Sequence, residues 1–190
     1  MKPAAKTNDA CDAVLPLDCV LRLGDVAPRA PANLCDTIYL GIQLTPEGDA
    51  LDEIAWLVGR PRQAAKASVC AQRDPLLETI RLQLIAWFAD PAFVFRLPLA
   101  TPRTAFQARL RDALCATRSG ETRTYGDLAK QLGSAPRAVG QALGSNPIPI
   151  IVPCHRIISA GKNRLTGFDH TREGPLLTMK AWLLEHEAAL

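Results

Sequence analysis

The segment from Ile148 to Ile157, which reads IPIIVPCHRI, constrains the fold of this chain more than any other stretch. Its prolines at positions 149 and 153 exclude a helix, and its run of isoleucine and valine is typical of a buried strand. The pattern predicts a buried strand over residues 148–152, which Pro153 ends just before Cys154. Burial would raise the pKa of that thiol unless a neighbour, here His155, accepts its proton. The thiol and histidine together indicate a nucleophile.

The composition is that of a folded, soluble protein. The 190 residues are 48% hydrophobic, which is enough apolar material for one large domain or two small ones. No window approaches the roughly 18 consecutive apolar residues of a membrane span. The first ten residues, MKPAAKTNDA, contain no apolar stretch typical of a signal peptide. We therefore expect a cytoplasmic protein, associated with the nucleoid if the source is bacterial, and no membrane partner.

The six cysteines are expected to be free thiols rather than a disulfide framework. They are Cys11, Cys19, Cys35, Cys70, Cys115 and Cys154. No two of them form a CxxC pair, and all three histidines lie in the last fifth of the chain. A mixed cysteine and histidine zinc site in the first half is therefore excluded. We expect neither a bound metal nor a cofactor, and an all-cysteine metal site in the N-terminal domain stays open.

Periodicity and proline positions divide the chain into two domains. The elements expected in the first are a strand over 36–44, a strand or short helix over 52–60, an amphipathic helix over 74–91 and a strand over 92–99. The segment 100–104 is expected to be a hinge. The prediction is an N-terminal α/β domain over 1–100, whose first residues (about 12) form a loose tail. A mostly helical domain over 101–190 follows, which makes the fold class α/β (α+β).

Two short helices are predicted within residues 124–144. Thr124 can cap the first helix, with Asp127 three residues later, and Gly133 can end it. Ser134 can cap the second, and Pro136 suits its first turn. Two such helices joined by a tight turn form a helix-turn-helix, although an ordinary helical hairpin would have the same pattern.

The charge distribution points to nucleic acid as a partner. Residues 101–164 contain 10 lysines and arginines against 3 aspartates and glutamates, a net charge of +7. Arg137 falls in the first turn of the second helix, where the helix dipole disfavours a cation. The outer face of that helix is small, with Gly140, Gln141 and Gly144. These features suit contact with a DNA backbone, and a solvated basic face is the alternative.

These motifs together resemble the methylated-DNA–protein-cysteine methyltransferases, also called O6-alkylguanine-DNA alkyltransferases. The resemblance spans residues 101–168, with TYGDLA, RAVGQAL, PCHR and LTGF, and resumes at KAWLLEHE over 180–187. It is faint over the first hundred residues. It implies a small N-terminal sheet with helices, then a mostly helical domain that contains a helix-turn-helix and the active-site cysteine.

The resemblance also implies roles for individual residues. Cys154 is the alkyl acceptor, His155 deprotonates it through a water, Glu187 orients His155, and Tyr125 assists catalysis and contacts the target phosphate. Arg137 enters the stack in place of the flipped base. The expected DNA-binding residues are Thr124, Tyr125, Arg137, Ala138, Gly140, Gln141 and Gly144, and the expected pocket residues are Asn146, Val152, Arg156, Thr166 and Gly167.

The implied function is DNA repair by a single-turnover suicide alkyltransferase. Such a protein flips O6-alkylguanine, or O4-alkylthymine, out of double-stranded DNA and transfers the alkyl group irreversibly to itself. The resemblance implies a monomer and leaves cooperative binding open. The alternatives are a non-catalytic alkyltransferase-like protein, a cysteine hydrolase and a plain helix-turn-helix regulator. The charged loop 169–179 is longer than the family's usual link, so its effect on the pocket stays open.

Overall fold

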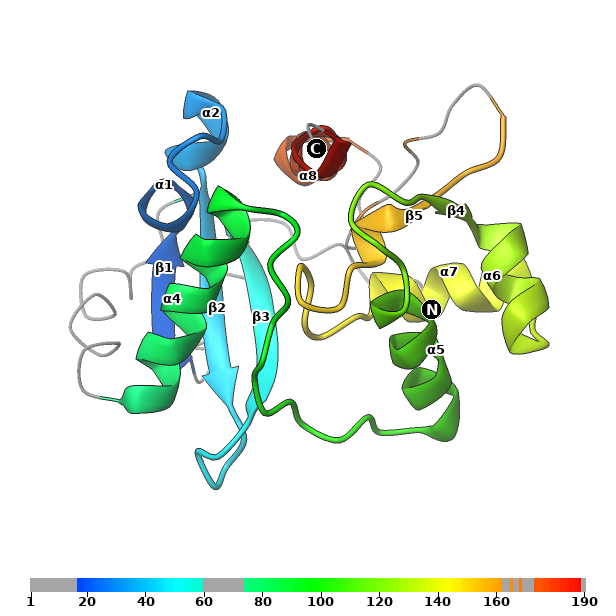
Figure 1. The fold of residues 1–190 in the computed structure, drawn as a ribbon, viewed down its shortest axis with the longest axis horizontal. Helices are drawn as coiled ribbons and strands as arrows, with labels where there is room; N and C mark the ends of the chain where they lie inside the picture. The colour runs from blue at the N-terminus through cyan, green and yellow to red at the C-terminus, as the bar shows by residue number, and fades with distance from the viewer. Residues whose placement is uncertain (1–16, 60–73, 162–164, 166–167, 169–172, 189–190) are drawn as a thin grey trace. The chain divides into compact units, whose positions relative to one another are not determined.

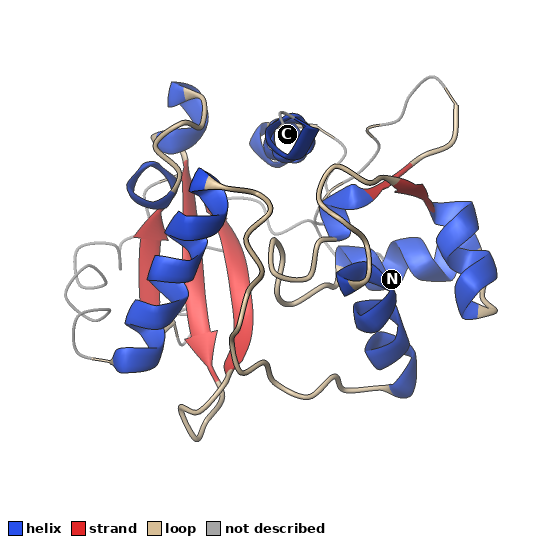
Figure 2. Cartoon of the chain, viewed as in Figure 1, coloured by secondary structure: helices blue, strands red, loops and turns tan. Residues whose placement is uncertain are grey.

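The chain divides into two compact units, Met1–Ala100 and Thr101–Leu190. The computed structural model describes residues 17–59, 74–161, 165, 168 and 173–188. The first unit contains a small antiparallel sheet, and the second is mostly helical (Figure 1, Figure 2). This mixture confirms the expected fold class. Within the described ranges no helix is long and apolar enough to cross a membrane.

The sheet of the first unit has three antiparallel strands in the order β1-β2-β3. They are β1 (Cys19–Arg22), β2 (Ile38–Leu44) and β3 (Leu51–Val58), and the short helices α1 (Leu23–Val26) and α2 (Ala32–Cys35) connect β1 to β2. The strand expected over 36–44 is confirmed as β2. In the segment 52–60, expected as a strand or a short helix, residues 52–58 are part of strand β3. The turn between β2 and β3 places Gly48 at a φ of +73°, which glycine adopts without strain.

Helix α4 (Pro75–Ala89) lies against this sheet (Figure 1) and confirms the amphipathic helix expected over 74–91. It begins at Asp74, whose carboxylate accepts hydrogen bonds from the N–H groups of Leu76 at 2.8 Å and Leu77 at 3.2 Å. The spacing of three and four residues puts its large apolar side chains on one face. The buried residues of that face are Leu77, Ile80, Leu84, Trp87 and Phe88, each worth about 1.5–3 kcal/mol of burial.

The strand expected over 92–99 is wrong. In the described residues this segment makes one isolated bridge, from Leu99 to Leu51, and is otherwise outside any ladder. The side-chain amide of Gln83 on α4 takes the place of a neighbouring strand. It donates to the carbonyl of Arg96 at 3.0 Å and accepts from the Arg96 N–H at 2.7 Å. One helix side chain therefore satisfies backbone groups that a strand would have paired.

The second unit contains four α-helices, a short 3-10 helix and one pair of short strands in its described residues. Helix α5 (Ala105–Cys115) begins at Thr104, whose hydroxyl accepts the N–H of Gln107 at 3.1 Å. Strand β4 (Arg123–Thr124) pairs in parallel with β5 (Ile157–Ile158). The 3-10 helix η2 (Cys154–Arg156) directly precedes β5, and the chain's last described helix is α8 (Pro175–Ala188).

The two helices expected over 124–144 are α6 (Tyr125–Leu132) and α7 (Pro136–Gly144). Thr124 caps α6 as expected, because its hydroxyl accepts the N–H of Asp127 at 3.1 Å. Gly133 ends that helix at a φ of +61°. The Ser134 cap is wrong: the N-cap of α7 is Ala135, without a side-chain bond. The Ser134 N–H instead donates to the carbonyl of Ala129 at 2.9 Å, so this residue closes α6 rather than opening α7.

Candidate active site

Cys154 follows a sequence of turns, not the buried strand that the apolar run predicts. Residues 148–152 are buried as expected, but they form turns and bends. Pro153 closes a tight turn in which the N–H of Cys154 donates to the carbonyl of Val152 at 2.8 Å. The thiol residue then opens η2 and is 8% exposed. The strand prediction fails because these backbone groups are bonded locally and by a side chain.

That side chain is Asn146. Its amide donates to the carbonyl of Val152 at 2.9 Å, and its oxygen accepts the N–H of Ile148 at 3.3 Å. Asn146 therefore bonds both ends of the turn, Ile148 and Val152, and it lies two positions beyond the last residue of α7. Asn146 and Val152, both expected near the guanine pocket, are brought together by this contact. The position of the nucleophile is thus linked to the end of the second helix.

His155 and Glu187 form a buried pair. Nε2 of His155 lies 2.9 Å from Oε1 of Glu187, and the two side chains are 0% and 1% exposed. Burial lowers the pKa of His155, although the Glu187 carboxylate opposes that shift, so the imidazole is neutral at pH 7. An N–H at Nε2 that donates to the carboxylate leaves Nδ1 as the basic nitrogen. The structure therefore contains the histidine and acid that the sequence predicts, in contact.

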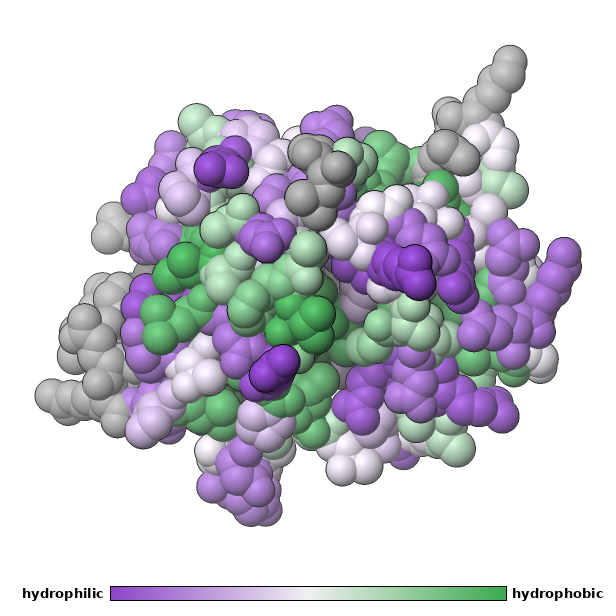
Figure 3. All heavy atoms as spheres, viewed as in Figure 1, coloured by the Kyte–Doolittle hydropathy of each residue, from purple (hydrophilic) through white to green (hydrophobic). Residues whose placement is uncertain are grey.

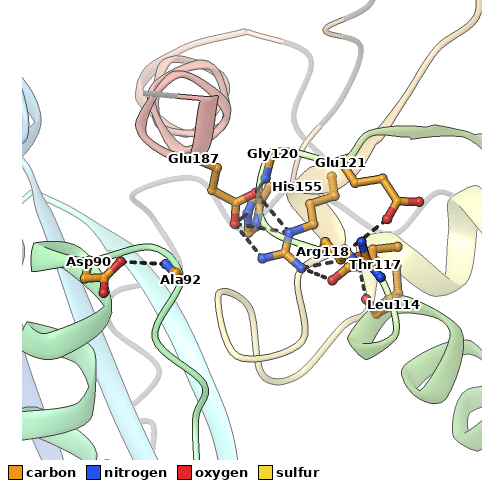
Figure 4. A network of polar contacts seen from close by, with 10 residues as sticks. Asp90, Ala92, Leu114, Thr117, Arg118, Gly120, Glu121, His155 and Glu187 are labelled. Atoms are coloured by element: carbon orange, nitrogen blue, oxygen red, sulfur yellow. Dashed lines mark hydrogen bonds and ion pairs between the residues drawn. The ribbon is translucent and has the colours of Figure 1, made fainter. Parts of the chain in front are cut away.

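Arg156 joins the same carboxylate to Thr117 in the loop after α5. Figure 4 shows Glu187, His155 and Thr117 in this network. Its guanidinium donates to Glu187 through Nη2 at 2.8 Å and through Nε at 2.9 and 3.1 Å. Its Nη1 donates to the backbone carbonyl of Thr117 at 2.5 Å. Burial alone would raise the pKa of Glu187, but hydrogen bonds from His155 and Arg156 outweigh it and lower the pKa to about 2. The acid stays ionised under all ordinary conditions.

Lys180 is a functional candidate that the sequence interpretation did not single out. It is 1% exposed, and its amine donates to the carbonyl of Ile157 at 2.8 Å. The same nitrogen lies 6.0 Å from the ring centroid of Tyr125. Lys180 precedes Glu187 by seven residues on α8, two helical turns, so both side chains lie on one face. That spacing is the signal that could have identified it.

Lys180 and Tyr125 share an electrostatic environment with Cys154. Burial lowers the pKa of Lys180 to about 8, and negative charge on Cys154 partly offsets that shift. Burial also raises the pKa of Tyr125, and charge on Cys154 adds to it. A cation at Lys180 favours the thiolate of Cys154, while a protonated Tyr125 keeps a hydrogen to donate. A displacement reaction at Cys154 requires both nearby, a cation to favour the thiolate and a proton donor for the leaving group.

The outer face of α7 carries the DNA-binding candidates. Arg137, Ala138 and Gln141 are exposed, and Gly144 is half-buried, whereas Val139 and Leu143 anchor the opposite face. Gly140 lies beside α6, where a Cβ atom would come within 3.7 Å of the Tyr125 ring. Thr124 is committed to its cap. In Figure 3 the side chains around α6 are mostly hydrophilic, consistent with the exposed Asp127, Lys130 and Gln131.

The structure does not test the remaining pocket candidates. Thr166 and Gly167 lie outside the described residues, as do residues 169–172 of the loop expected over 169–179. That loop is shorter than expected, because residues 175–179 already belong to helix α8. Phe168, which follows Gly167 in the sequence, is buried. In the described ranges, no group of three or more His, Cys, Asp or Glu side chains could hold a metal ion. In those ranges Cys19 and Cys154 are buried, Cys35 is half-buried and Cys115 is exposed, and these four cysteines form no disulfide.

Comparison with known proteins places this geometry in a family. Residues 105–189 match the family model described as 6-O-methylguanine DNA methyltransferase, DNA binding domain. A methylated-DNA–protein-cysteine methyltransferase of Methanosarcina acetivorans is 40% identical over 129 residues, which are 67% of this chain and 81% of the relative. The chain belongs to the methylated-DNA–protein-cysteine methyltransferase family. A relative with the same name from Mycobacterium leprae is 36% identical over 153 residues, 80% of this chain and 81% of that protein.

Solved structures of similar proteins share the fold of this methyltransferase. The Mycobacterium tuberculosis OGT in complex with DNA matches with a TM-score of 0.60 at 35% identity, over 80% of this chain and 87% of that one. An O6-methylguanine DNA methyltransferase from Methanococcus jannaschii matches with a TM-score of 0.60 at 28% identity, over 81% and 90%. The family confirms the expected enzyme class, DNA repair by alkyl transfer and DNA as the partner.

Replacement of Glu187 should destabilise the methyltransferase strongly. Glu187→Gln leaves the buried guanidinium of Arg156 without its counter-charge, so we expect a loss of about 3–5 kcal/mol in the free energy of unfolding at pH 7. The carboxylate protonates at its ordinary pKa of 4.5 in the unfolded chain but only near 2 in the folded one. Its stabilisation is therefore complete above pH 4.5 and disappears as the pH falls toward 2.

Denaturant unfolding at several pH values measures both effects. Glu185→Gln is the matched control, because Glu185 is exposed on the same helix, and it should change stability by less than about 0.5 kcal/mol. An equal loss of stability in Glu187→Gln and Glu185→Gln would contradict a stabilising role of the Glu187 network. So would a difference in stability between the two variants that does not shrink as the pH falls.

Removal of the Lys180 cation should make Cys154 less reactive near neutral pH. In Lys180→Met the thiolate loses a favourable charge. The curve of iodoacetamide alkylation rate against pH should therefore shift by roughly one pH unit toward higher pH. Lys130→Met removes an exposed lysine from α6 and is the control that should leave the curve in place. Coincident curves for Lys180→Met and the unchanged protein would show that the amine does not act on the thiol.

Proposed function

We propose that this protein flips an O6-alkylguanine out of duplex DNA and transfers its alkyl group to Cys154, once per chain. The observation that carries the proposal is the buried Cys154 at the start of a 3-10 helix whose next two residues bond Glu187. A purely structural cysteine has no need of an ionised buried acid and a neutral histidine on the adjacent residues. A nucleophile needs both, to lose its proton and to be held in place.

The chemistry follows from the protonation states. Nδ1 of His155 accepts the thiol proton through a water, and Nε2 donates to Glu187, which stabilises the resulting imidazolium. The thiolate attacks the alkyl carbon in line with the O6 atom, so an S–C bond forms as the C–O6 bond breaks. The electron pair of that bond goes to guanine, which takes a proton from Tyr125 and leaves neutral. The product is a thioether at Cys154, a C–S bond that resists hydrolysis.

Access of a base to Cys154 requires that it leave the DNA stack, because the thiol is almost fully buried. The exposed Arg137 on α7 is proposed to fill the space that the flipped base vacates. The small outer face of that helix, with Ala138 and Gly144, allows its backbone to approach a narrow minor groove. Thr124 and Gln141 would contact the DNA backbone and groove, and O4-alkylthymine is proposed as a second substrate.

The turn before Cys154 would form one wall of the guanine pocket. Val152 is 3% exposed and is held by Asn146, while Arg156 keeps η2 fixed to α8. Thr166 and Gly167 are proposed to line the opposite wall, next to the segment that precedes α8. One chain is proposed to act on one lesion as a monomer. No observation in the described residues favours the non-catalytic alternative, in which resemblance implies that the acceptor cysteine is replaced.

A label-transfer experiment tests the function. Duplex DNA with radiolabelled O6-methylguanine should pass its label to the protein until one label is bound per chain, with no further turnover. Cys154→Ala should abolish transfer and retain DNA binding, because the backbone contacts of α7 do not involve the thiol. Cys115→Ala, which removes an exposed thiol, is the matched control and should transfer normally. Binding without transfer by the unchanged chain would favour the non-catalytic alternative, and turnover would exclude the single-use mechanism.

A variant of Arg137 tests base flipping separately from chemistry. Arg137→Ala should slow transfer from duplex DNA by about tenfold or more, because unstacking a base costs a few kcal/mol that the inserted side chain offsets. Transfer from free O6-benzylguanine needs no flipping and should keep its rate. Lys130→Ala, which removes an exposed cation from α6, controls for general charge loss. Equal slowing on both substrates would count against the proposed insertion.

A further inference from the structure

Ile150 has an unusual backbone conformation four residues before the nucleophile. Its φ is +74°, and it is the only residue other than glycine in the described ranges with a positive φ. Left-handed backbone brings Cβ too close to the following carbonyl, and a β-branched side chain makes the crowding worse. Asn, Asp and Gly tolerate this conformation, whereas isoleucine is one of the residues least suited to it. The surrounding structure must therefore hold it there.

Two features hold Ile150 in this conformation. Its side chain is 2% exposed, so a return to ordinary φ would carry a buried apolar group out of its site. The turn around it is also closed, because the N–H of Val152 donates to the carbonyl of Ile148 at 2.9 Å. Asn146 bonds the same two residues, Ile148 and Val152, through its side chain. The apex of the turn is thus fixed by burial and its two ends by hydrogen bonds.

The strained residue lies between two fixed parts of the chain. Upstream, Asn146 anchors the turn just beyond α7. Downstream, η2 is anchored by Arg156 to Glu187 and to the carbonyl of Thr117. A change in φ at Ile150 rotates every atom between these anchors, and Cys154 lies among them. Displacement of a reacting atom by about 1 Å can cost on the order of a hundredfold in rate.

We propose that Ile150 is a positioning residue for alkyl transfer: its left-handed backbone, kept in place by burial of the side chain, aims the Cys154 thiol at the alkyl carbon. The inference rests on the proposed function, because transfer to Cys154 is its readout. Glycine would adopt the same φ without strain, but it would also populate many others. The isoleucine side chain selects one conformation, so the thiol has one position.

Stability measurements test the strain. At Ile150 the glycine variant should be more stable than the alanine variant, by about tenfold in the unfolding equilibrium constant, because only glycine escapes the left-handed penalty. At the neighbouring Ile151, which is 8% exposed and has no positive φ, the order should reverse. Denaturant midpoints of Ile150→Gly, Ile150→Ala, Ile151→Gly and Ile151→Ala give this comparison. The same order at both positions overturns the strain argument and the proposal with it.

Two reagents distinguish a change in the direction of the Cys154 thiol from a change in its general reactivity. Iodoacetamide reports how reactive the thiolate is from any direction, whereas free O6-benzylguanine reacts only when the thiol is aimed at the bound base. Under native conditions, and per folded molecule, Ile150→Val should transfer from O6-benzylguanine nearly as fast as the unchanged chain. Ile150→Gly should be slower and Ile150→Ala slower still, by about tenfold or more. The iodoacetamide rates of all three should stay within about twofold across the pH range.

The outcomes distinguish this inference from the function on which it rests. Equal transfer rates in the valine, glycine and alanine variants, or equal losses with both reagents, overturn the positioning role while transfer by the unchanged chain stands. A loss in Ile151→Ala as large as in Ile150→Ala also overturns it, since that residue has ordinary backbone. No transfer by the unchanged chain overturns the proposed function and this inference together.

Discussion

One buried carboxylate holds the second unit together. Glu187 accepts hydrogen bonds from His155 and Arg156, and it lies 3.4 Å from the backbone N–H of Gly120. These partners belong to η2 and to the loop after α5, so a single side chain on α8 joins three segments that are distant in the sequence. A charge so deeply buried is tolerable only because its partners neutralise it. The orientation of His155, and with it the basicity of Nδ1, follows from this arrangement.

Local sequence patterns predicted the helices better than the strands. The spacing of apolar residues identified α4, and Thr124 with Gly133 delimited α6, because helix ends and faces depend on neighbours within a turn or two. The expected strands over 92–99 and 148–152 failed because side chains outside them, Gln83 and Asn146, satisfy some of their backbone groups. Propensity describes which residues suit an extended backbone, but not which partner completes it.

The part of the candidate site that forms a contiguous sequence motif could be predicted from the sequence. Cys154, His155 and Arg156 adjoin one another, and resemblance extended the set to Glu187 across an unusual loop; the structure brings His155, Arg156 and Glu187 into contact. Lys180 was missed because a lysine on a helix is usually solvated, and its spacing of seven residues from Glu187 was the one signal that it faces the interior. The left-handed backbone of Ile150 gave no sequence signal at all, since isoleucine is among the last residues expected there.

Gly140 on α7 lies close to the ring of Tyr125 at the start of α6. A methyl group at position 140 would sit at ordinary van der Waals distance from the tyrosine ring, whereas a longer side chain would displace it. The changes in the free energy of unfolding caused by substitutions at positions 140 and 125 should therefore not be additive.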